Sequence, residues 1–370
     1  MKKVIVGMSG GVDSSVTAAI LKEQGYDVEG VSFILYETRM KNTFPGCCSI
    51  ESVNDAAKTA ALAGVRHTSV DLRDEFMSMV IEPFIEAYSK GVTPNPCILC
   101  NKHIKFPFLL KIADERGADF IATGHYARAI SPEARKRGSS EEGVRTSILM
   151  KGLDPKKDQS YVLYVLGQEV LGRLLLPLGE KRKDEVRVIA RELHLPAADR
   201  PESQEICFIE DKKYFRLIGN LKEGAKGPLI DIKTGKILGT HDGIYLYTMG
   251  QRKRLGIATG SPLYVVKIDY SDNAVYVGPK ESAMIREFVV GDINWIVPIT
   301  DINKPGNLKG RSFRANVKVR STMKDEPANI TLISDASAGI IYDDPQWAPA
   351  PGQSAVFYDC DTVVGGGVIE

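Results

Sequence analysis

The first half of the chain alternates short apolar runs with segments whose apolar residues recur at helical spacing. The apolar runs predict strands at Lys3–Met8, Tyr26–Leu35, His67–Leu72 and Ala118–Thr123. Helical spacing predicts helices at Ser14–Gln24, Ser52–Ala63, Arg73–Ser89, Lys102–Arg116, Gln159–Gln168 and Lys183–Leu193. Pro83 is expected to kink or divide the third of these helices. Strands that alternate with helices of this length imply a doubly wound α/β fold, with a parallel sheet covered on both faces.

From about Cys207 onward the pattern changes to short β-type runs separated by turn residues. These runs predict strands at Gly227–Ile232, Gly243–Thr248, Leu263–Asp269, Ala274–Gly278, Phe313–Val319, Asn329–Ile333, Ser354–Tyr358 and Thr362–Ile369. A break near Glu281, or in the polar stretch Pro298–Asn307, separates a small central β domain from a C-terminal β-barrel or sandwich. Three parts are therefore predicted: an α/β domain of residues 1–207, a central β domain of residues 208–281 and a barrel of residues 282–370. The polar stretch Ser131–Gly143 is predicted to be a surface insertion.

The composition excludes several classes of protein. Of the 370 residues, 43% are apolar and 26% are charged, and the formal net charge is +1. The chain therefore has no large positive net charge that would require a polyanionic partner. A local basic face on the surface is still compatible with this net charge. No run approaches the ~20 apolar residues of a membrane span, and the run after Lys3 is shorter than a signal-peptide core. We expect a cytoplasmic protein without a membrane partner, whose six cysteines are reduced or used for chemistry or metal binding.

A glycine-rich loop, Ser9–Ser15, lies between the first predicted strand and the first predicted helix. Its glycines let the backbone approach an anion closely, and the helix start supplies N–H donors and a favourable dipole. No lysine follows the glycines, so this is not the Walker loop, and the spacing is not Gly-x-Gly-x-x-Gly. Because ligands of such sheets bind beyond the carboxyl ends of the strands, the loop predicts a phosphate site there.

Three cysteines are candidates for chemistry. Cys97 and Cys100 lie in a proline-rich loop before the predicted Lys102 helix, and the nearby helix start is expected to lower the pKa of the Cys100 thiol. Cys207 lies where the α/β pattern ends. A zinc site needs two more ligands at short spacing, and the compartment disfavours a structural disulfide. From spacing alone, a redox role and a metal role both remain open.

Several segments, in order along almost the whole chain, resemble the bacterial tRNA-specific 2-thiouridylases, which belong to the PP-loop ATP pyrophosphatases. The segments are Ser9–Ser15, Thr93–Phe106, Ala122–Tyr126, Lys157–Tyr161, Glu205–Ile209, Tyr247–Gly256 and Gly352–Val356. The resemblance implies that ATP, with Mg²⁺, adenylates O2 of the wobble uridine of tRNA. Sulfur then replaces that oxygen, and AMP and pyrophosphate are released.

The resemblance also assigns roles to individual residues. Cys207 matches the cysteine that carries the persulfide, and Cys100 matches the nucleophile that forms a disulfide with it. Positions matching ATP contacts are Gly7, Met8, Ser9, Gly10, Gly11, Val12, Asp13, Ser14, Phe33 (with Leu35 as competitor) and Gly124. Asp13 is a candidate for helping to hold Mg²⁺, with a helix cap as the alternative. Positions matching tRNA contacts are Asn95, Pro96 and Cys97 beside the target base, and His125, Lys157, Asp158, Gln159, Arg320, Ser321 and Gln353 elsewhere.

Cys97 departs from the family pattern, because many members carry aspartate there. Cys97, Cys100 and Cys207 together make three thiolates, which leave one iron of a [4Fe–4S] cluster open for sulfide. Two mechanisms therefore remain open: the sulfur comes from a cysteine persulfide, or it comes from sulfide bound to a [4Fe–4S] cluster. A third interpretation is that Cys97 only replaces aspartate as a neighbour of the base.

The implied partners are tRNAs of the Lys, Glu and Gln type and a cysteine desulfurase or sulfur-relay protein. The residues themselves support RNA binding modestly, since Lys304–Lys324 contains seven Lys or Arg and no Asp or Glu. A solvated edge strand guarded by lysines is the alternative. Two rival functions remain: an amidotransferase-like ligase acting on a small substrate, and a nucleotide-sensing RNA-binding protein without catalysis.

Overall fold

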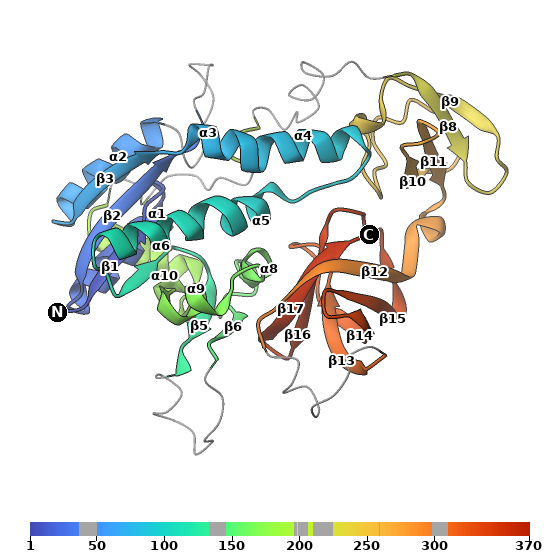
Figure 1. Cartoon of the computed structure of the whole chain (residues 1–370). Coiled ribbons are helices and arrows are strands. Elements are labelled where there is room, and N and C mark those ends of the chain that lie inside the picture. The colour runs from blue at the N-terminus through green and yellow to red at the C-terminus, as the bar shows by residue number, and fades with distance from the viewer. Residues whose placement is uncertain are drawn as a thin grey trace.

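The computed structural model describes residues 1–36, 50–132, 146–195, 198, 206–209, 225–258, 260–297 and 310–370. Figure 1 shows an α/β part that holds the N-terminus, a small sheet beyond the far end of α4 (Glu82–Ser89), and a barrel beneath that sheet. Within those ranges no helix is long and apolar enough to cross a membrane. Cys47, Cys48, Pro298–Asn307 and most of Ser131–Gly143 lie outside them.

The α/β part is built on a five-stranded parallel sheet in the order β3-β2-β1-β4-β7. Its strands are β1 (Lys3–Gly7), β2 (Asp27–Ile34), β3 (Arg66–Asp71), β4 (Phe120–Ala122) and β7 (Leu174–Leu175). Side chains of β1 alternate between two cores, since Val4 and Val6 join one and Ile5 joins the other. Both faces of the sheet are thus covered, and the predicted doubly wound fold is confirmed.

The helices of this part lie close to their predicted positions. They include α1 (Val12–Glu23), α2 (Ile50–Leu62), α8 (Ser160–Leu163), α9 (Gln168–Arg173) and α10 (Lys183–Glu192), with a 3-10 turn η3 (Pro177–Glu180) before α10. The helix predicted over Gln159–Gln168 is only a single turn, α8, followed by the separate α9.

Two neighbouring helices each contain a π-helical turn that ends two residues before a proline. The first runs through α3 (Arg73–Phe76), η1 (Met77–Ile81) and α4, which contains Pro83. The second runs through α5 (Pro96–Cys100), η2 (Asn101–Lys105) and α6 (Phe106–Glu115), which contains Pro107. Proline lacks an N–H donor and crowds the carbonyl four residues earlier, so a wider turn accommodates it. The expected disturbance at Pro83 therefore takes the form of a π turn.

The C-terminal β pattern forms two sheets. The central sheet has the order β10-β11-β8-β9, and six strands of the C-terminal sheet close into a barrel through the additional β12–β17 pairing. The central strands are β8 (Gly227–Asp231), β9 (Ile237–His241), β10 (Tyr264–Asp269) and β11 (Ala274–Gly278). The barrel strands are β12 (Met284–Trp295), β13 (Ser312–Lys318), β14 (Glu326–Ser334), β15 (Ser337–Trp347), β16 (Ser354–Asp359) and β17 (Thr362–Ile369). The predicted central β domain and C-terminal barrel are confirmed, whereas the boundaries at residues 207 and 281 stay a prediction.

The β regions differ from expectation in three respects. Strands β9, β12 and β15 were not predicted. The strand predicted over Gly243–Thr248 is a 3-10 turn, η5 (Ile244–Leu246), because Gly243 has a φ of +150° and turns the chain out of a strand path. The hairpin of β5 (Ala127–Ile130) and β6 (Ile148–Lys151) comes from the α/β segment but pairs with β17. The barrel is therefore attached to the α/β part by shared sheet as well as by the chain.

The central sheet also packs on the α/β part. Helix α4 contacts η5, and Gly91 lies directly after that helix. A Cβ atom at Gly91, whose φ is +73°, would lie 2.4 Å from Ile268 Cγ2 of β10. The three parts thus meet beside the connection from α4 to α5 (Figure 1). Helix α5 carries Cys97 and Cys100 and is called the cysteine helix below.

Candidate active site

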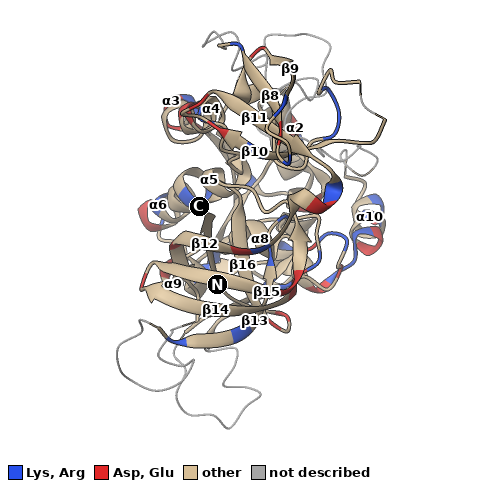
Figure 2. Cartoon of the chain, turned by 90° about the vertical axis from the view of Figure 1, so that its right-hand side faces the viewer, with Lys and Arg blue, Asp and Glu red and all other residues tan. Residues whose placement is uncertain are grey.

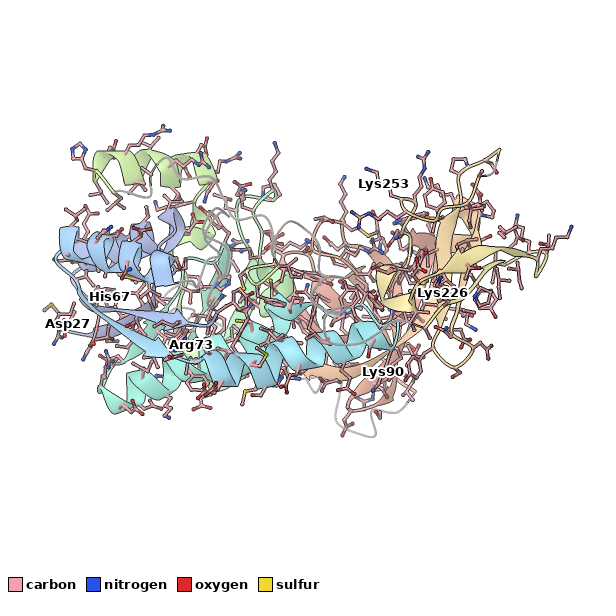
Figure 3. All side chains as sticks on the ribbon, turned by 90° about the horizontal axis from the view of Figure 1, so that it is seen from above. Asp27, His67, Arg73, Lys90, Lys226 and Lys253 are labelled. Atoms are coloured by element: carbon pink, nitrogen blue, oxygen red, sulfur yellow. The ribbon has the colours of Figure 1, made fainter. Side chains whose placement is uncertain are left out.

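The glycine-rich loop is held at the carboxyl end of β1 by its neighbour β2. Met8 donates its N–H to Val31 O at 2.8 Å, and Ser32 Oγ donates to Met8 O at 2.7 Å. Because that hydroxyl hydrogen is used, Ser32 accepts from His67 Nε2 at 2.8 Å. Burial lowers the pKa of His67, which Figure 3 labels on the sheet, so the ring is neutral with its proton on Nε2. The loop thus has a fixed shape before any ligand binds.

Close backbone approaches explain two glycines of the predicted ATP site. Gly10 has a φ of +72°, and a Cβ there would lie 2.2 Å from Ser52 O at the start of α2. A Cβ at Gly124 would lie 2.8 Å from both Asp13 C and Ser14 N, at the start of α1. The N-cap residue of α1 is Gly11, and in the described part of the chain no side chain caps the helix. Its first N–H groups are the donors that a bound anion would use. Phe33 and Leu35, the two candidates for one ATP contact, are both buried in the same core. Burial therefore does not decide between them.

Asp13 is engaged by the protein itself. Lys183 Nζ lies 2.7 Å from both carboxylate oxygens, and Tyr126 donates its hydroxyl to Oδ1 at 2.7 Å. The Lys183 ammonium also lies 5.5 Å from the centroid of the Tyr126 ring. The described contacts therefore support a role for Asp13 in holding Lys183 at the loop, and a helix cap is not among them. A role for Asp13 in holding Mg²⁺ stays a prediction.

Sequence reasoning missed Lys183 and Tyr126. Lys183 is buried although it is the first residue of α10, where a cation opposes the helix dipole. The sequence did contain a signal for Lys183: a lysine at the first position of a predicted helix, where the helix dipole disfavours a cation, indicates that another contact holds it there. The Walker loop carries a lysine of its own, whereas here a lysine reaches the glycine-rich loop from a helix 170 positions further along the chain.

The cysteine helix begins at Pro96, earlier than the predicted start at Lys102. Asn95 Oδ1 accepts from the N–H groups of Cys97 at 3.1 Å and Ile98 at 3.4 Å. An Asn cap followed by proline at the first helical position is a strong start signal, and the sequence contained it. Cys97, not Cys100 as expected, occupies the first turn, where the helix dipole favours an anion. Cys97 is exposed and Cys100 is buried.

Replacing Asn95 with alanine is expected to loosen this helix start. The lost cap should cost about 1 kcal/mol locally, so amide hydrogen exchange at Cys97 and Ile98 should be roughly fivefold faster. Asn329→Ala is the matched control, since among the described residues the Asn329 amide donates to Thr331 Oγ1 in the barrel and not to a helix start. Unchanged exchange at Cys97 in the Asn95 variant would contradict the cap.

The Cys207 segment lies beside the cysteine helix. Phe208 is buried between Phe76, at 5.7 Å between ring centroids, and Phe84, at 5.4 Å. Those rings flank the π turn η1, which contacts α5, and Cys100 and Phe208 belong to one core against which Cys207 packs. Cys207 itself is partly exposed. The two cysteines predicted to exchange sulfur are thus brought into the same part of the molecule.

The described residues do not support an iron–sulfur cluster. Cys97, Cys100 and Cys207 are all described, yet no group of three His, Cys, Asp or Glu side chains in the described ranges is arranged to hold a metal. Cys97 and Cys100 also differ in exposure on their shared helix. The arrangement of the three cysteines therefore gives the cluster no support.

Two residues predicted to contact tRNA, Asp158 and Gln159, form hydrogen bonds within the chain. Asp158 Oδ1 accepts from the N–H groups of Gly152 at 3.1 Å and Ser160 at 3.0 Å, and its 5% exposed carboxylate lies 3.7 Å from Lys318 Nζ. Gln159 Oε1 accepts from the Tyr126 N–H at 2.9 Å, and the Gln159 N–H donates back to Tyr126 O at 2.8 Å. These contacts fix the start of α8 against the barrel and against the Gly124–Tyr126 turn.

His125 is only partly exposed. His125 Nδ1 lies 2.7 Å from Thr123 Oγ1, and the ring stacks on Phe106. Burial, with a smaller contribution from Lys105, lowers the pKa of His125 well below its usual range. A neutral imidazole offers RNA a hydrogen bond and not a charge. Lys157 is partly exposed at the same edge.

The predicted basic face of the barrel is only partly present. Lys318 is buried against Asp158, and Arg314 forms two hydrogen bonds to the Asp343 carboxylate. Lys304 and Lys309 lie outside the described residues. In Figure 2 basic and acidic positions are interspersed over α10. Another run of basic residues, Arg252–Arg254, includes Lys253, which Figure 3 places on the central part, far from His67.

Arg320 and Gln353 bind backbone carbonyls of other parts of the chain. Arg320 Nη2 donates to Ala348 O at 2.8 Å and to Met249 O at 3.1 Å. Gln353 Nε2 donates to Thr93 O at 2.9 Å. Ser321 is exposed in the turn after β13. The roles of all these residues toward tRNA remain predictions.

Comparison with known proteins identifies the family. The family models described as tRNA methyl transferase HUP domain, tRNA methyl transferase PRC-barrel domain and Aminomethyltransferase beta-barrel domain match residues 2–211, 217–279 and 285–369. The tRNA-specific 2-thiouridylase MnmA of Carboxydothermus hydrogenoformans is 43% identical, and the match covers 100% of this chain and 98% of that protein. MnmA 1 of Caldanaerobacter subterraneus subsp. tengcongensis and MnmA of Clostridioides difficile are 45% and 42% identical with the same coverage. This chain therefore belongs to the tRNA-specific 2-thiouridylase family.

Proposed function

We propose that this chain is a tRNA-uridine 2-sulfurtransferase that uses ATP to exchange O2 of the wobble uridine for sulfur. A uracil carbonyl is a poor electrophile and its oxygen is a poor leaving group. Attack of O2 on the α-phosphorus of ATP releases pyrophosphate and turns that oxygen into part of an AMP leaving group. The glycine-rich loop and the uncapped start of α1 supply the donors for the phosphates.

The observation that carries the proposal is the packing of the Cys207 segment into the core that holds Cys100. In the proposed second step, the terminal sulfur of a Cys207 persulfide attacks C2 of the adenylated base, and AMP leaves. Cys100 then attacks the Cys207 sulfur, which breaks its bond to the transferred sulfur and leaves 2-thiouridine and a Cys100–Cys207 disulfide. A thiol reductant restores both cysteines before the next persulfide is loaded.

The finer assignments belong to the same proposal. Mg²⁺ enters with ATP, the acceptors are tRNAs of the Lys, Glu and Gln type, and a cysteine desulfurase or relay protein supplies the persulfide. Asn95, Pro96 and Cys97 are assigned to the place beside the target base, at the start of the cysteine helix, where Cys97 is exposed and Pro96 is buried. His125, Lys157, Ser321 and the remaining donors of Arg320 are the proposed RNA contacts.

The test is nucleoside mass analysis of unmodified tRNA after incubation with enzyme, ATP, Mg²⁺ and a persulfide donor. The expected result is an oxygen-to-sulfur exchange at the wobble uridine that requires every component. ATP cleavage that proceeds equally well without tRNA would instead favour the ligase alternative. Binding of ATP and tRNA without any cleavage would favour the non-catalytic one.

Removing iron separates the two sulfur routes. Enzyme purified aerobically and treated with an iron chelator is expected to keep full activity with a persulfide donor, because the described cysteines form no metal site. The measurement is the rate of 2-thiouridine formation together with an iron and sulfide assay. Activity that disappears with the iron and returns after anaerobic reconstitution would overturn the persulfide route.

A further inference from the structure

A single turn of the barrel, Ala348–Gln353, joins all three parts of the molecule, and we call it the junction turn. On the side of the central sheet, Arg320 donates to both Ala348 O and Met249 O. Gly250 lies so close that a Cβ there would be 3.0 Å from Ala348 Cβ. The turn is therefore fixed to the central part by contacts that leave little clearance.

On its other side the junction turn holds one residue of the α/β part, Thr93. The Thr93 N–H donates to Pro351 O at 2.9 Å, and Gln353 Nε2 donates to Thr93 O at 2.9 Å. Gly352 has a φ of +85°, and a Cβ there would lie 2.3 Å from Val92 Cγ1. Both backbone polar groups of Thr93 are thus satisfied by the same turn.

Thr93 begins the segment that leads into the cysteine helix. Pro94 and Pro96 each fix a φ angle near −65°, so the segment has little freedom to absorb a displacement. Asn95 between them caps the helix that carries Cys97 and Cys100. A shift of Thr93 would therefore be passed on to the helix start.

We infer that Gln353 is a positioning residue for sulfur transfer: through Thr93 it holds the cysteine helix in register with the barrel surface that receives tRNA. The inference rests on the proposed function and deepens it. It differs from a direct RNA contact, because the role assigned here is carried by the amide N–H that Gln353 donates to Thr93 O and not by a bond to RNA. The junction turn then links barrel and active site mechanically.

Two substitutions disturb this contact in different ways. Gln353→Met keeps the length of the side chain and removes its hydrogen bond. Gly352→Ala removes no polar group and forces Val92 and Thr93 to move, because its Cβ has no room. Gln346→Met is the matched control, since the contact that the structure describes for the Gln346 amide is to Asp344 O on the same strand.

Both junction variants are expected to slow the turnover of bound tRNA to thiolated product by roughly 10- to 100-fold, the usual cost of misplacing a reacting group. The affinity for tRNA should stay at the wild-type value. Alkylation of Cys100, measured by peptide mass spectrometry in the tRNA-free enzyme, should become faster, while alkylation of the exposed and distant Cys360 stays the same. The melting temperature of each variant shows whether it folds. If one of the two variants does not fold, the positioning role is tested on the other.

A weaker affinity for tRNA with unchanged Cys100 alkylation in Gln353→Met would overturn the inference and favour a direct RNA contact. Wild-type turnover in both variants would overturn it as well. These outcomes differ from failure of the proposed function, in which the wild-type enzyme itself makes no 2-thiouridine.

Discussion

Replacing Cys100 with serine is expected to lower 2-thiouridine formation by at least about 10³-fold, the scale on which loss of a nucleophile acts. Serine is nearly isosteric and Cys100 is buried in an apolar core, so the fold should persist. A hydroxyl cannot form the disulfide that releases the transferred sulfur. Pyrophosphate release should still occur, because the glycine-rich loop and Lys183 are untouched. The measurements are nucleoside mass analysis and pyrophosphate release on the same samples.

Two further variants sharpen this result. Cys207→Ser should lose thiolation equally, since the persulfide has no carrier, whereas Cys360→Ser, in the exposed turn between β16 and β17, should behave as wild type. Mass spectrometry should detect a Cys100–Cys207 disulfide after turnover by the wild-type enzyme. Full thiolation by Cys207→Ser with a persulfide donor would refute the proposed route.

Local patterns predicted the fold well because they carry their own physics. Four of the five strands of the parallel sheet, the glycine-rich loop and the strands Ala274–Gly278 and Thr362–Ile369 were readable from apolar runs and turn residues, whereas the two-residue strand β7 was missed. The start of the cysteine helix at Pro96 was equally readable, since Asn95 and Pro96 form a standard start signal. That error came from treating prolines only as loop residues.

Contacts between distant segments were not readable. No periodicity pairs Asp13 with Lys183, or Thr93 with Gln353, because each pair is brought together only by the closed fold. Charge counting failed for a related reason. Lys318 and Arg314 contribute to a basic segment in the sequence, but Asp158 and Asp343 come from elsewhere to neutralise them.

Lys183→Met is expected to lower tRNA-dependent ATP cleavage by roughly 10²- to 10³-fold, the usual cost of removing one preorganised donor from developing charge. The glycine-rich loop carries no lysine of its own, and Lys183 brings a buried ammonium to its edge. Pyrophosphate carries more negative charge as it departs, so a cation fixed there stabilises the transition state more than the ground state. Release of pyrophosphate under saturating tRNA is the measurement.

The size of the effect on stability tests this reasoning separately. Breaking a fully buried ion pair costs several kcal/mol, but the Asp13 side chain is 33% exposed and keeps the Tyr126 hydroxyl, so about 1–2 kcal/mol is expected. Lys183→Arg retains the charge and should recover part of the activity, and Lys181→Met, two residues earlier, should behave as wild type. If Lys183→Met lost stability but kept wild-type ATP cleavage, Lys183 would hold the loop only through Asp13. Loss of cleavage with little loss of stability would instead mean that its charge acts on the phosphates.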